Sequence, residues 1–314
     1  MTPSRLPLRI AEKKSRLDAL RPLPAAVLSR LNDDLAVEWT FNSNAIEGNT
    51  LTLQETRLIL ETGLTIGGKS LREHFEVVNH REAIRFVEAL ATEAEPITPF
   101  HVRQIHKLVI ARIDDENAGT YRSLPVRISG AVFEPPEAWE VQGAMASWGD
   151  WLAGEASALP SVDRAALAHH RLVAIHPFID GNGRTARLVM NLLSMRDGYP
   201  PAIIQRANRR QYYSVLARAD RGVSGPLVNF VSRVVERSLT IYLEAATPRM
   251  SPPATDDTWI LLRDAAAGTP YNQEYLSLLA RTGQLEATKR GRNWYTTRSA
   301  VAAYRASIAK PRRE

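Results

Sequence analysis

The stretch IHPFIDGNGRTARL, residues 175–188, combines a histidine, a carboxylate, a Gly-Asn-Gly turn and two arginines. Apolar periodicity on both sides, over 164–175 and 184–195, predicts two helices joined by this turn. A glycine-rich turn that opens a helix presents free backbone N–H groups at the positive end of the helix dipole. Arg184 and Arg187 are three positions apart and so lie on one face of that helix. The stretch therefore predicts a phosphate-binding helix N-terminus within a mainly helical fold.

Two further side chains of this stretch indicate a reaction. Asp180 is its only carboxylate, and one carboxylate together with phosphate oxygens and waters is a common arrangement around magnesium. His176 is a base near neutral pH that can accept the proton of a hydroxyl. The planar guanidinium groups of the two arginines suit phosphate oxygens. Together these residues predict transfer from a magnesium-bound nucleotide to an incoming hydroxyl.

On the residues alone, two other interpretations of the turn stay open. An ordinary corner between two helices also needs small residues, with His176 and Phe178 in the core. The glycines at 181 and 183 also fit the loose dinucleotide-binding pattern, but that pattern needs a preceding strand, whereas 164–175 is predicted to be helical.

A histidine metal site is a third alternative, because His169, His170 and His176 lie close together in the sequence. Helical spacing places His169 and His176 on one face. No carboxylate or cysteine on that helix completes a ligand set, so the histidines predict a metal site only weakly.

The whole motif, from His176 through Asp180 and Arg184 to Arg187, resembles the complete signature of Fic-domain proteins. The resemblance extends from about residue 91 to residue 242. It includes GTYRSLPVRISG, similar to the family's substrate-docking hairpin, and QYYSVLARAD, similar to its nucleotide-base pocket. It implies a Fic-type helical bundle with a small β-hairpin flap. It also implies transfer of AMP from ATP, with Mg²⁺, to a Ser, Thr or Tyr hydroxyl of a target protein.

The resemblance assigns roles position by position. His176 becomes the general base and Asp180 the Mg²⁺ ligand. The nucleotide-binding positions are Gly181, Asn182, Gly183, Arg184, Thr185, Ala186, Arg187, Tyr212, Tyr213 and Asp220. The flap that docks the target comprises Val126, Arg127, Ile128, Ser129 and Gly130, within a hairpin predicted over 125–133. The intact Gly-Asn-Gly argues against the Doc-like kinase branch, and Asp220 stands where some relatives place Asn.

A second short stretch, FNSNAIEGNTLT at 41–52, resembles the family's inhibitory-helix motif through Ser43, Glu47 and Gly48. On its own residues it is a helix end, with Glu47 in the last turn and Gly48 as the C-cap. A glutamate there opposes the helix dipole and gains from a cationic partner. We expect Arg187 to be that partner. The ion pair would occupy an arginine needed for the γ-phosphate and keep the enzyme nearly silent.

Composition bounds the rest of the 314-residue chain, which is 44% hydrophobic with a net charge of +6. The absence of cysteine excludes disulfides, thiolate zinc sites and cysteine nucleophiles. The chain has no apolar run of about 20 residues and no apolar signal core at its start, which predicts a cytoplasmic protein without membrane contact. The sequence sets neither the target protein nor the net direction, AMP addition or removal.

Stretches with proline and glycine interrupt the helical pattern and divide the chain into four segments. We predict an N-terminal helical region at 1–95, a catalytic core at 96–246, a linker at 247–257 and a winged-helix-like domain at 258–314. The last contains a predicted hairpin, 285–288 and 294–297, with a basic tip. Two interpretations of this domain stay open: DNA binding through phosphate contacts and the wing, which would make the protein a DNA-binding regulator, or protein contact and homodimer formation.

Overall fold

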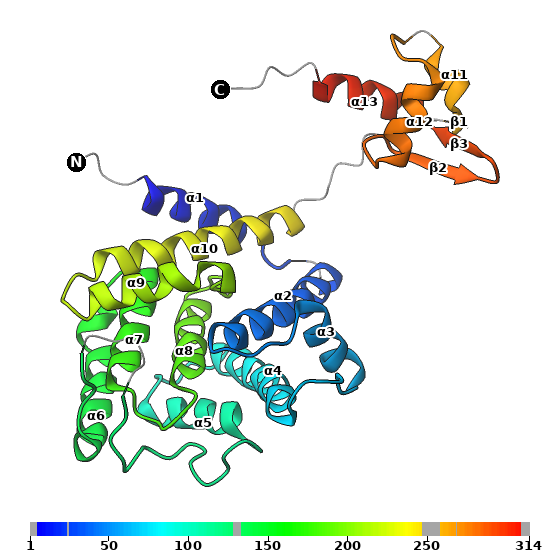
Figure 1. Cartoon of the computed structure of the whole chain (residues 1–314). Helices are drawn as coiled ribbons and strands as arrows, with labels where there is room; N and C mark the ends of the chain where they lie inside the picture. The colour runs from blue at the N-terminus through cyan, green and yellow to red at the C-terminus, as the bar shows by residue number, and fades with distance from the viewer. Residues whose placement is uncertain (1–4, 24, 128–132, 247–257, 268, 309–314) are drawn as a thin grey trace. The chain divides into compact units, whose positions relative to one another are not determined.

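The computed structural model describes residues 5–23, 25–127, 133–246, 258–267 and 269–308. Its mainly helical character confirms the predicted fold class. The chain separates into two compact units, Met1–Thr247 and Pro248–Glu314, and Figure 1 shows the elements of each. The predicted linker, 247–257, lies outside the described residues. Within the described ranges, no helix has the length and apolar character needed to cross a membrane.

The larger unit is built from helices. These are α1 (Leu6–Ala19), α2 (Ala25–Ile46), α3 (Leu53–Thr62), α4 (Leu71–Ala91), α5 (Pro99–Ile110), α6 (Val141–Ala153), α7 (Ser161–Ile175), α8 (Asn182–Arg196), α9 (Arg209–Ala219) and α10 (Gly225–Ala246). Short 3-10 turns precede or follow some of them: η1 (Ala138–Glu140), η2 (Glu155–Ala158) and η3 (Arg206–Asn208). The longest connection between the helices, residues 111–137, follows α5.

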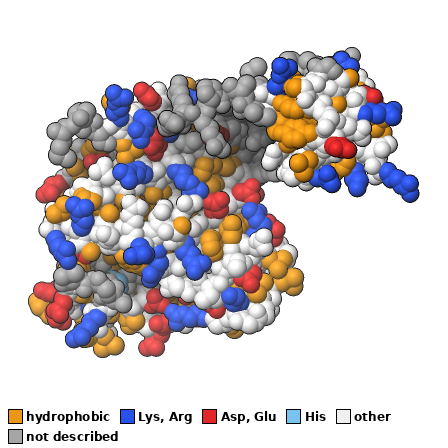
Figure 2. Space-filling view, turned by 45° about the horizontal axis from the view of Figure 1, so that its top comes forward, with side chains coloured by type: hydrophobic (Ala, Val, Ile, Leu, Met, Phe, Trp, Pro, Cys, Tyr) orange, Lys and Arg blue, Asp and Glu red, His pale blue; other side chains and the backbone are white. Residues whose placement is uncertain are grey.

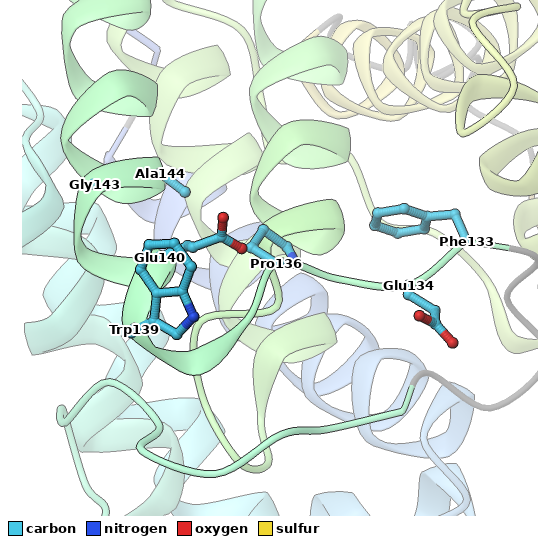
Figure 3. Close-up of a pocket in the computed structure, with 7 residues that line it drawn as sticks. All are labelled: Phe133, Glu134, Pro136, Trp139, Glu140, Gly143 and Ala144. Carbon is cyan, nitrogen blue, oxygen red and sulfur yellow. The ribbon is translucent and has the colours of Figure 1, made fainter.

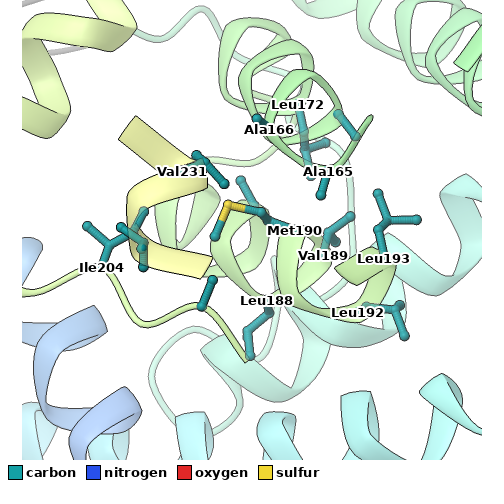
Figure 4. Packing of buried hydrophobic residues seen from close by; sticks show 14 of the residues in the cluster. Ala165, Ala166, Leu172, Leu188, Val189, Met190, Leu192, Leu193, Ile204 and Val231 are labelled. Carbon is teal, nitrogen blue, oxygen red and sulfur yellow. The ribbon is translucent and has the colours of Figure 1, made fainter. Parts of the chain in front are cut away.

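Helix α8 lies at the centre of this unit and packs against α2, α4, α5 and α7. Its side chains are buried on nearly every face, as expected for a helix surrounded by others. Figure 4 shows Leu188, Met190 and Leu192 of α8 among apolar side chains of α7 and α10. Because its neighbours fix α8 on all sides, the N-terminus that carries the glycine-rich turn is held in a defined place.

Capping explains where the structure departs from the predicted helix bounds. Helix α4 begins at Leu71, although the apolar periodicity that predicts this helix begins only at Val77. Ser70 accepts a hydrogen bond from the Glu73 N–H, and Glu73 in turn accepts from the Ser70 N–H, which forms a capping box. The box satisfies the first N–H groups of the helix, so α4 extends through a polar turn that apolar periodicity does not detect.

Helix α1 lies within the predicted N-terminal helical region, although no apolar periodicity in the sequence marks it. Its apolar side chains Leu6, Ile10 and Leu17 are buried, and the helix packs along α10. Lys13 and Arg9 both pair with Glu236 of α10, at 3.0 and 2.8 Å. The many charged residues of this segment obscure its apolar stripe in the sequence.

The smaller unit comprises β1 (Ile260–Leu261), α11 (Leu262–Ala266), α12 (Gln273–Arg281), β2 (Ala287–Arg290), β3 (Asn293–Thr296) and α13 (Arg298–Ile308). Its three-stranded antiparallel sheet has the order β1-β3-β2. The hairpin β2–β3 lies where the sequence places one, and its two-residue turn has Gly291 at φ 61°. A winged-helix identity and DNA binding by this unit stay predictions.

The other predicted hairpin, over 125–133, lies partly outside the described residues. Ile128, Ser129 and Gly130 lie outside the described residues. Val126 and Arg127 are described and are not in a strand. The flap therefore stays a prediction.

The packing of α1 on α10 generates a test of stability. Leu17 is fully buried, whereas Leu8 of the same helix is 68% exposed. Leu17→Ala should lower the free energy of unfolding of the larger unit by about 3 kcal/mol, through lost burial and the cavity left behind. Leu8→Ala, the matched control, should change it by less than about 0.5 kcal/mol. Urea unfolding followed by circular dichroism measures both, and equal effects would contradict the packing of α1.

Candidate active site

The loop between α7 and α8 reverses the chain with two left-handed residues. His176 ends α7 at φ 50° and ψ 58°, and Gly181 precedes α8 at φ 75°. A left-handed backbone is unusual for a residue other than glycine and persists only where its surroundings enforce it. Phe178, between them, is fully buried and stacks on His106 with ring centroids 3.6 Å apart. The buried ring anchors the loop and leaves Ile179 and Asp180 exposed.

Asn182 closes this loop from within. Its Oδ1 accepts from the Phe178 N–H at 2.9 Å, and its Nδ2 donates to the Phe178 carbonyl at 2.7 Å. The asparagine side chain is thus used for structure, and what it leaves to a ligand is its backbone N–H. One amide group thus ties the first residue of α8 to the backbone of Phe178 in the middle of the loop.

His106 supports the loop from α5. The Gly119 N–H donates to its Nδ1 at 3.0 Å, so Nε2 carries the proton and donates to the Asp180 carbonyl at 3.0 Å. Burial lowers the pKa of His106 to about 4, which keeps this arrangement neutral at physiological pH. His106 therefore positions the carbonyl of the residue that the sequence assigns to the metal.

Arg122 holds the loop from the other side. Its backbone N–H donates to the Pro177 carbonyl at 2.9 Å, and its Nε donates to the His176 carbonyl at 2.8 Å. The same guanidinium donates to the carbonyls of Leu124 and Pro136. One buried cation thus joins the backbone of His176 to the segments on both sides of the predicted flap.

The imidazole of His176 is oriented by its own helix. Its Nδ1 lies 3.3 Å from the Val173 carbonyl, which assigns the proton to Nδ1 and leaves Nε2 with a free lone pair. Burial lowers the pKa of His176 below its usual 6.5, and the nearby Arg122 acts in the same direction. A neutral imidazole with an available Nε2 is the form that accepts a proton.

The N-terminus of α8 has the features of an anion-binding site, and we refer to it as the anion site. The N–H groups of its first residues, Asn182 to Arg184, have no intrahelical acceptor, and the dipole is positive there. The helical ladder begins with the Thr185 N–H, which donates to the Gly181 carbonyl at 2.9 Å. The side chains of Thr185 and Ala186 are fully buried. These two positions therefore pack in the core and offer a ligand no exposed side chain.

Arg187 is buried and contacts the end of α2 through an ion pair and two hydrogen bonds. Its Nη1 lies 2.8 Å from Oε1 of Glu47. Its Nε donates to Ser43 Oγ at 3.1 Å and its Nη2 to the Ser43 carbonyl at 2.8 Å. Burial opposes the charge of Arg187, but Glu47 and Tyr212 outweigh it and raise the pKa of the guanidinium. The predicted contact between Glu47 and Arg187 is present. The Nε and Nη2 atoms of the guanidinium, however, bind Ser43 and not a second carboxylate oxygen.

The carboxylate of Glu47 also covers the anion site. Glu47 follows the last residue of α2 in a turn completed by Gly48, whose φ of 107° requires glycine. A Cβ added to Gly183 would clash with Glu47 Oε1, so the carboxylate rests directly on the glycine of the turn. Glu47 therefore occupies the place that the positive end of α8 offers to a phosphate.

Asp180 lies at the exposed edge of the site, in contact with the buried Arg184. Arg184 is buried and contacts Asp180 at 3.4 Å and Glu76 at 3.3 Å, and Arg72 also pairs with Asp180. Burial raises the pKa of Asp180, but Arg184, the Gly181 N–H and Arg72 together lower it below the usual value. Asp180 is thus ionised at neutral pH, and its side chain is 46% exposed.

The three histidines do not gather into a metal site. His169 bonds to the hydroxyl of Tyr212 at 2.9 Å, and His170 bonds to Asp220 at 2.8 Å. Among the described residues, no three His, Cys, Asp or Glu side chains form a group that could hold a metal ion. A cation at this site would have Asp180 as its protein ligand and would need oxygen atoms from a nucleotide.

The predicted base-pocket residues differ in accessibility. Tyr212 is buried, with its ring 5.9 Å from the guanidinium carbon of Arg187. Tyr213 is 37% exposed and lies under Arg209 at 4.8 Å. Asp220 accepts from His170 and is largely buried. Of the two tyrosines, only Tyr213 presents a ring that a base could reach.

Sequence reasoning missed several supporting residues. His106 sits in an apolar helix with no motif around it, so the sequence holds no signal for its role. Arg122 lies within the stretch GTYRSLPVRISG, between Tyr121 and Ser123. Nothing in that position indicates that it donates hydrogen bonds to four backbone carbonyls.

Comparison with known proteins agrees with this geometry. The model of the Fic/DOC family matches residues 96–194. A Fic domain containing signaling protein from Bacteroides thetaiotaomicron is 34% identical, with a TM-score of 0.71, over 76% of this chain and 97% of that one. The chain belongs to the Fic/DOC family. This membership confirms the Fic-type helical bundle that the sequence predicts for the larger unit.

Two further relatives extend the comparison. A protein adenylyltransferase Fic from Nematostella vectensis is 40% identical over 241 residues, which is 76% of this chain and 56% of that protein. This Fic chain spans about half the length of the curated relatives it matches. A Fic family protein from Desulfovibrio desulfuricans shares the fold over 95% of this chain and 97% of its own, with a TM-score of 0.62 and 21% identity.

Closure of the Fic loop by Asn182 generates a second test. Asn182→Ala leaves the buried N–H and carbonyl of Phe178 without partners, and we expect a loss of about 2 kcal/mol in unfolding free energy. Asn182→Asp keeps the acceptor for the N–H but turns an oxygen toward the carbonyl, so it should not restore stability. Urea unfolding measures both variants. Wild-type stability in Asn182→Ala would contradict the closing role.

Proposed function

We propose that this Fic protein transfers AMP from ATP to a Ser, Thr or Tyr hydroxyl of a target protein, and also to itself. The observation that carries the proposal is the anion site at the N-terminus of α8, with His176 on one side and Arg184 and Arg187 on the other. The relatives named protein adenylyltransferase support the same reaction.

In this reaction the hydroxyl oxygen of the target forms a bond to the α-phosphorus of ATP. The bond from that phosphorus to the bridging oxygen breaks, and pyrophosphate leaves. Nε2 of His176 takes the hydroxyl proton. Positioned charge supplies most of the acceleration in such transfers, here from the backbone N–H groups of Asn182 and Gly183 and from the two arginines. Tyr213 is the exposed ring on which the base could stack.

Asp180 would hold the Mg²⁺ of the nucleotide. Its carboxylate is ionised and half exposed at the edge of the anion site, and one carboxylate with phosphate oxygens is a common magnesium arrangement. When bound, the ion would neutralise charge on the phosphates. Arg72, which pairs with Asp180 in this structure, would have to release the carboxylate.

Glu47 would hold the enzyme in a nearly silent state. Its carboxylate rests on Gly183 and pairs with Arg187. A γ-phosphate could therefore reach neither the guanidinium of Arg187 nor the backbone at Gly183. Because Arg187 is buried, its charge is not screened by water and the contact is correspondingly strong. ATP could bind only with its phosphates displaced from the line of attack of the target hydroxyl.

Removal of the carboxylate tests this proposal. Glu47→Gly should raise transfer about 10²-fold, since misplacement of reacting groups by about an ångström costs that much. Glu47→Gln, which keeps the size of the side chain but loses its charge, should give an intermediate gain. Labelling with radioactive ATP and Mg²⁺, followed first as self-modification, measures all three proteins.

The double variant Glu47→Gly with Arg187→Ala is the control. It should lose the gain, because the arginine is the group that the glutamate restrains. If Glu47→Gly labels no more strongly than wild type at matched ATP and Mg²⁺, inhibition by this residue is refuted.

The role of His176 has its own test in the Glu47→Gly background. His176→Asn suits the left-handed backbone, so it should keep the fold and bind ATP while transfer falls about 10²–10⁴-fold. With His176 present, its lowered pKa should place the midpoint of the fall in rate below pH 6.5, because protonation removes the base as the pH falls. A midpoint above pH 6.5 would argue against His176 as the base.

A further inference from the structure

A groove lies on the α6 side of the active-site loop. It is lined by Phe133, Glu134, Pro136, Trp139, Glu140, Gly143 and Ala144, and its volume is about 600 Å³. We call it the acidic groove. In Figure 3, Phe133 and Glu134 lie at one end, Trp139 and Glu140 at the other, and Pro136 between them. We propose that the acidic groove docks a basic and apolar segment of the protein that receives AMP, an inference that rests on the proposed function.

The apolar part of the groove is open to solvent. Trp139 is 81% exposed, so its ring contributes little to the stability of this chain. Tryptophan is among the residues that most often dominate the binding energy of protein interfaces. Phe133, Pro136 and Ala144 add apolar surface beside it. The volume is enough for a few apolar side chains of a partner.

The backbone that carries the tryptophan is fixed before any partner arrives. Trp139 lies in η1, where the Glu137 N–H donates to Oε2 of Glu140 at 2.8 Å. The turn leads directly into α6, which is anchored in the core by Val141 and Met145. Binding would therefore have to order the exposed ring of Trp139 but not the backbone of this turn.

The charge of the groove selects the kind of partner. The stretch 133–144 contains three glutamates and no lysine or arginine, although the whole chain carries +6. On the face shown in Figure 2, by contrast, Lys and Arg side chains are interspersed with Asp and Glu. Glu134 and Glu140 stand at opposite ends of the groove, so a segment with a basic residue near each end and an apolar residue between them would match it.

The groove is physically tied to the catalytic base. Arg122 donates from one guanidinium to the Pro136 carbonyl in the groove wall and to the His176 carbonyl at 2.8 Å. A segment bound in the groove is therefore held at a fixed position relative to Nε2 of His176. Docking there would raise the local concentration of a hydroxyl near the α-phosphate, in addition to any contact with the predicted flap.

Gly143 makes a sharp test possible. It lines the groove within α6, and a Cβ added there meets no atom within 4 Å. Gly143→Leu should fill the groove without disturbing the core, and leucine is also the better helix former. Gly225→Leu is the matched control, because Gly225 is helical, exposed and also has no atom within 4 Å of the added Cβ.

The experiment selects a random peptide library on wild type and on Gly143→Leu. Sequences recovered by wild type and by Gly225→Leu, but not by Gly143→Leu, should combine Lys or Arg with Leu, Phe or Met. A peptide so selected should lose at least about tenfold in affinity on Trp139→Ala. It should also bind more weakly at high salt. ATP affinity should be unchanged in the groove variants.

The acidic residues are tested with the same peptide. Glu134→Gln with Glu140→Gln should weaken binding and remove most of its salt dependence, whereas Glu274→Gln with Glu286→Gln, two exposed glutamates of the smaller unit, should change neither. Recovery of acidic or uncharged sequences, equal recovery on Gly143→Leu, or no selected sequence at all would overturn the proposal.

Failure of the docking site and failure of AMP transfer are separable, because binding is measured without ATP. If Glu47→Gly labels nothing while the groove still selects basic peptides, the proposed reaction is wrong and the docking surface stands. If Glu47→Gly labels strongly and the groove selects nothing, docking alone is overturned.

Discussion

The contact between Glu47, Ser43 and the buried guanidinium of Arg187 is the interaction on which the arrangement of the site depends. It joins the end of α2 to the start of α8, two elements far apart in the sequence. A buried arginine needs a complete set of acceptors, since an unpaired buried charge costs several kcal/mol. Here the acceptors come from the same turn that places a carboxylate on the anion site. The carboxylate of Glu47 therefore does two things at once: it pairs with the buried Arg187, and it occupies the position predicted for a phosphate.

A nucleotide that displaced Glu47 would have to replace the negative charge that the Glu47 carboxylate provides to Arg187. A γ-phosphate carries the charge and the oxygen geometry to do so, while Ser43 can keep the other half of the guanidinium. Because Arg187 binds both Glu47 and Ser43, loss of Glu47 alone costs less free energy than loss of both partners. It also explains why Gly183 is needed at the turn: the backbone must admit either a carboxylate or a phosphate oxygen at van der Waals distance.

Around this contact the site is assembled by groups that do not react. Asn182 closes the loop, His106 holds the Asp180 carbonyl and Arg122 holds the His176 carbonyl. Each is buried and bonded to backbone, so the loop has little freedom to change shape. The central helix α8, packed on several sides, supplies a rigid base for these groups. Catalysis that relies on positioned charge requires this rigidity, because misplaced dipoles contribute little.

The sequence by itself determined the local features. Apolar periodicity located helices such as α7 and α8, the β2–β3 hairpin followed from its turn, and the spacing from His176 to Arg187 predicted a base and a phosphate site. These features depend on neighbours within a few residues, where backbone geometry is set by residue type. The Glu47 motif was recognised through its resemblance, and Arg187 was chosen as partner by charge.

Only the tertiary structure decided the rest. It set Ser43 as the second partner of Arg187, placed Tyr212 in the core and Tyr213 at the surface, and gave His106 and Arg122 their roles. It also added α1 to the larger unit and created the acidic groove at the start of α6. Each of these depends on which surfaces meet when helices distant in sequence pack together. That choice minimises exposed apolar area and unpaired polar groups over the whole unit, and no local pattern encodes it.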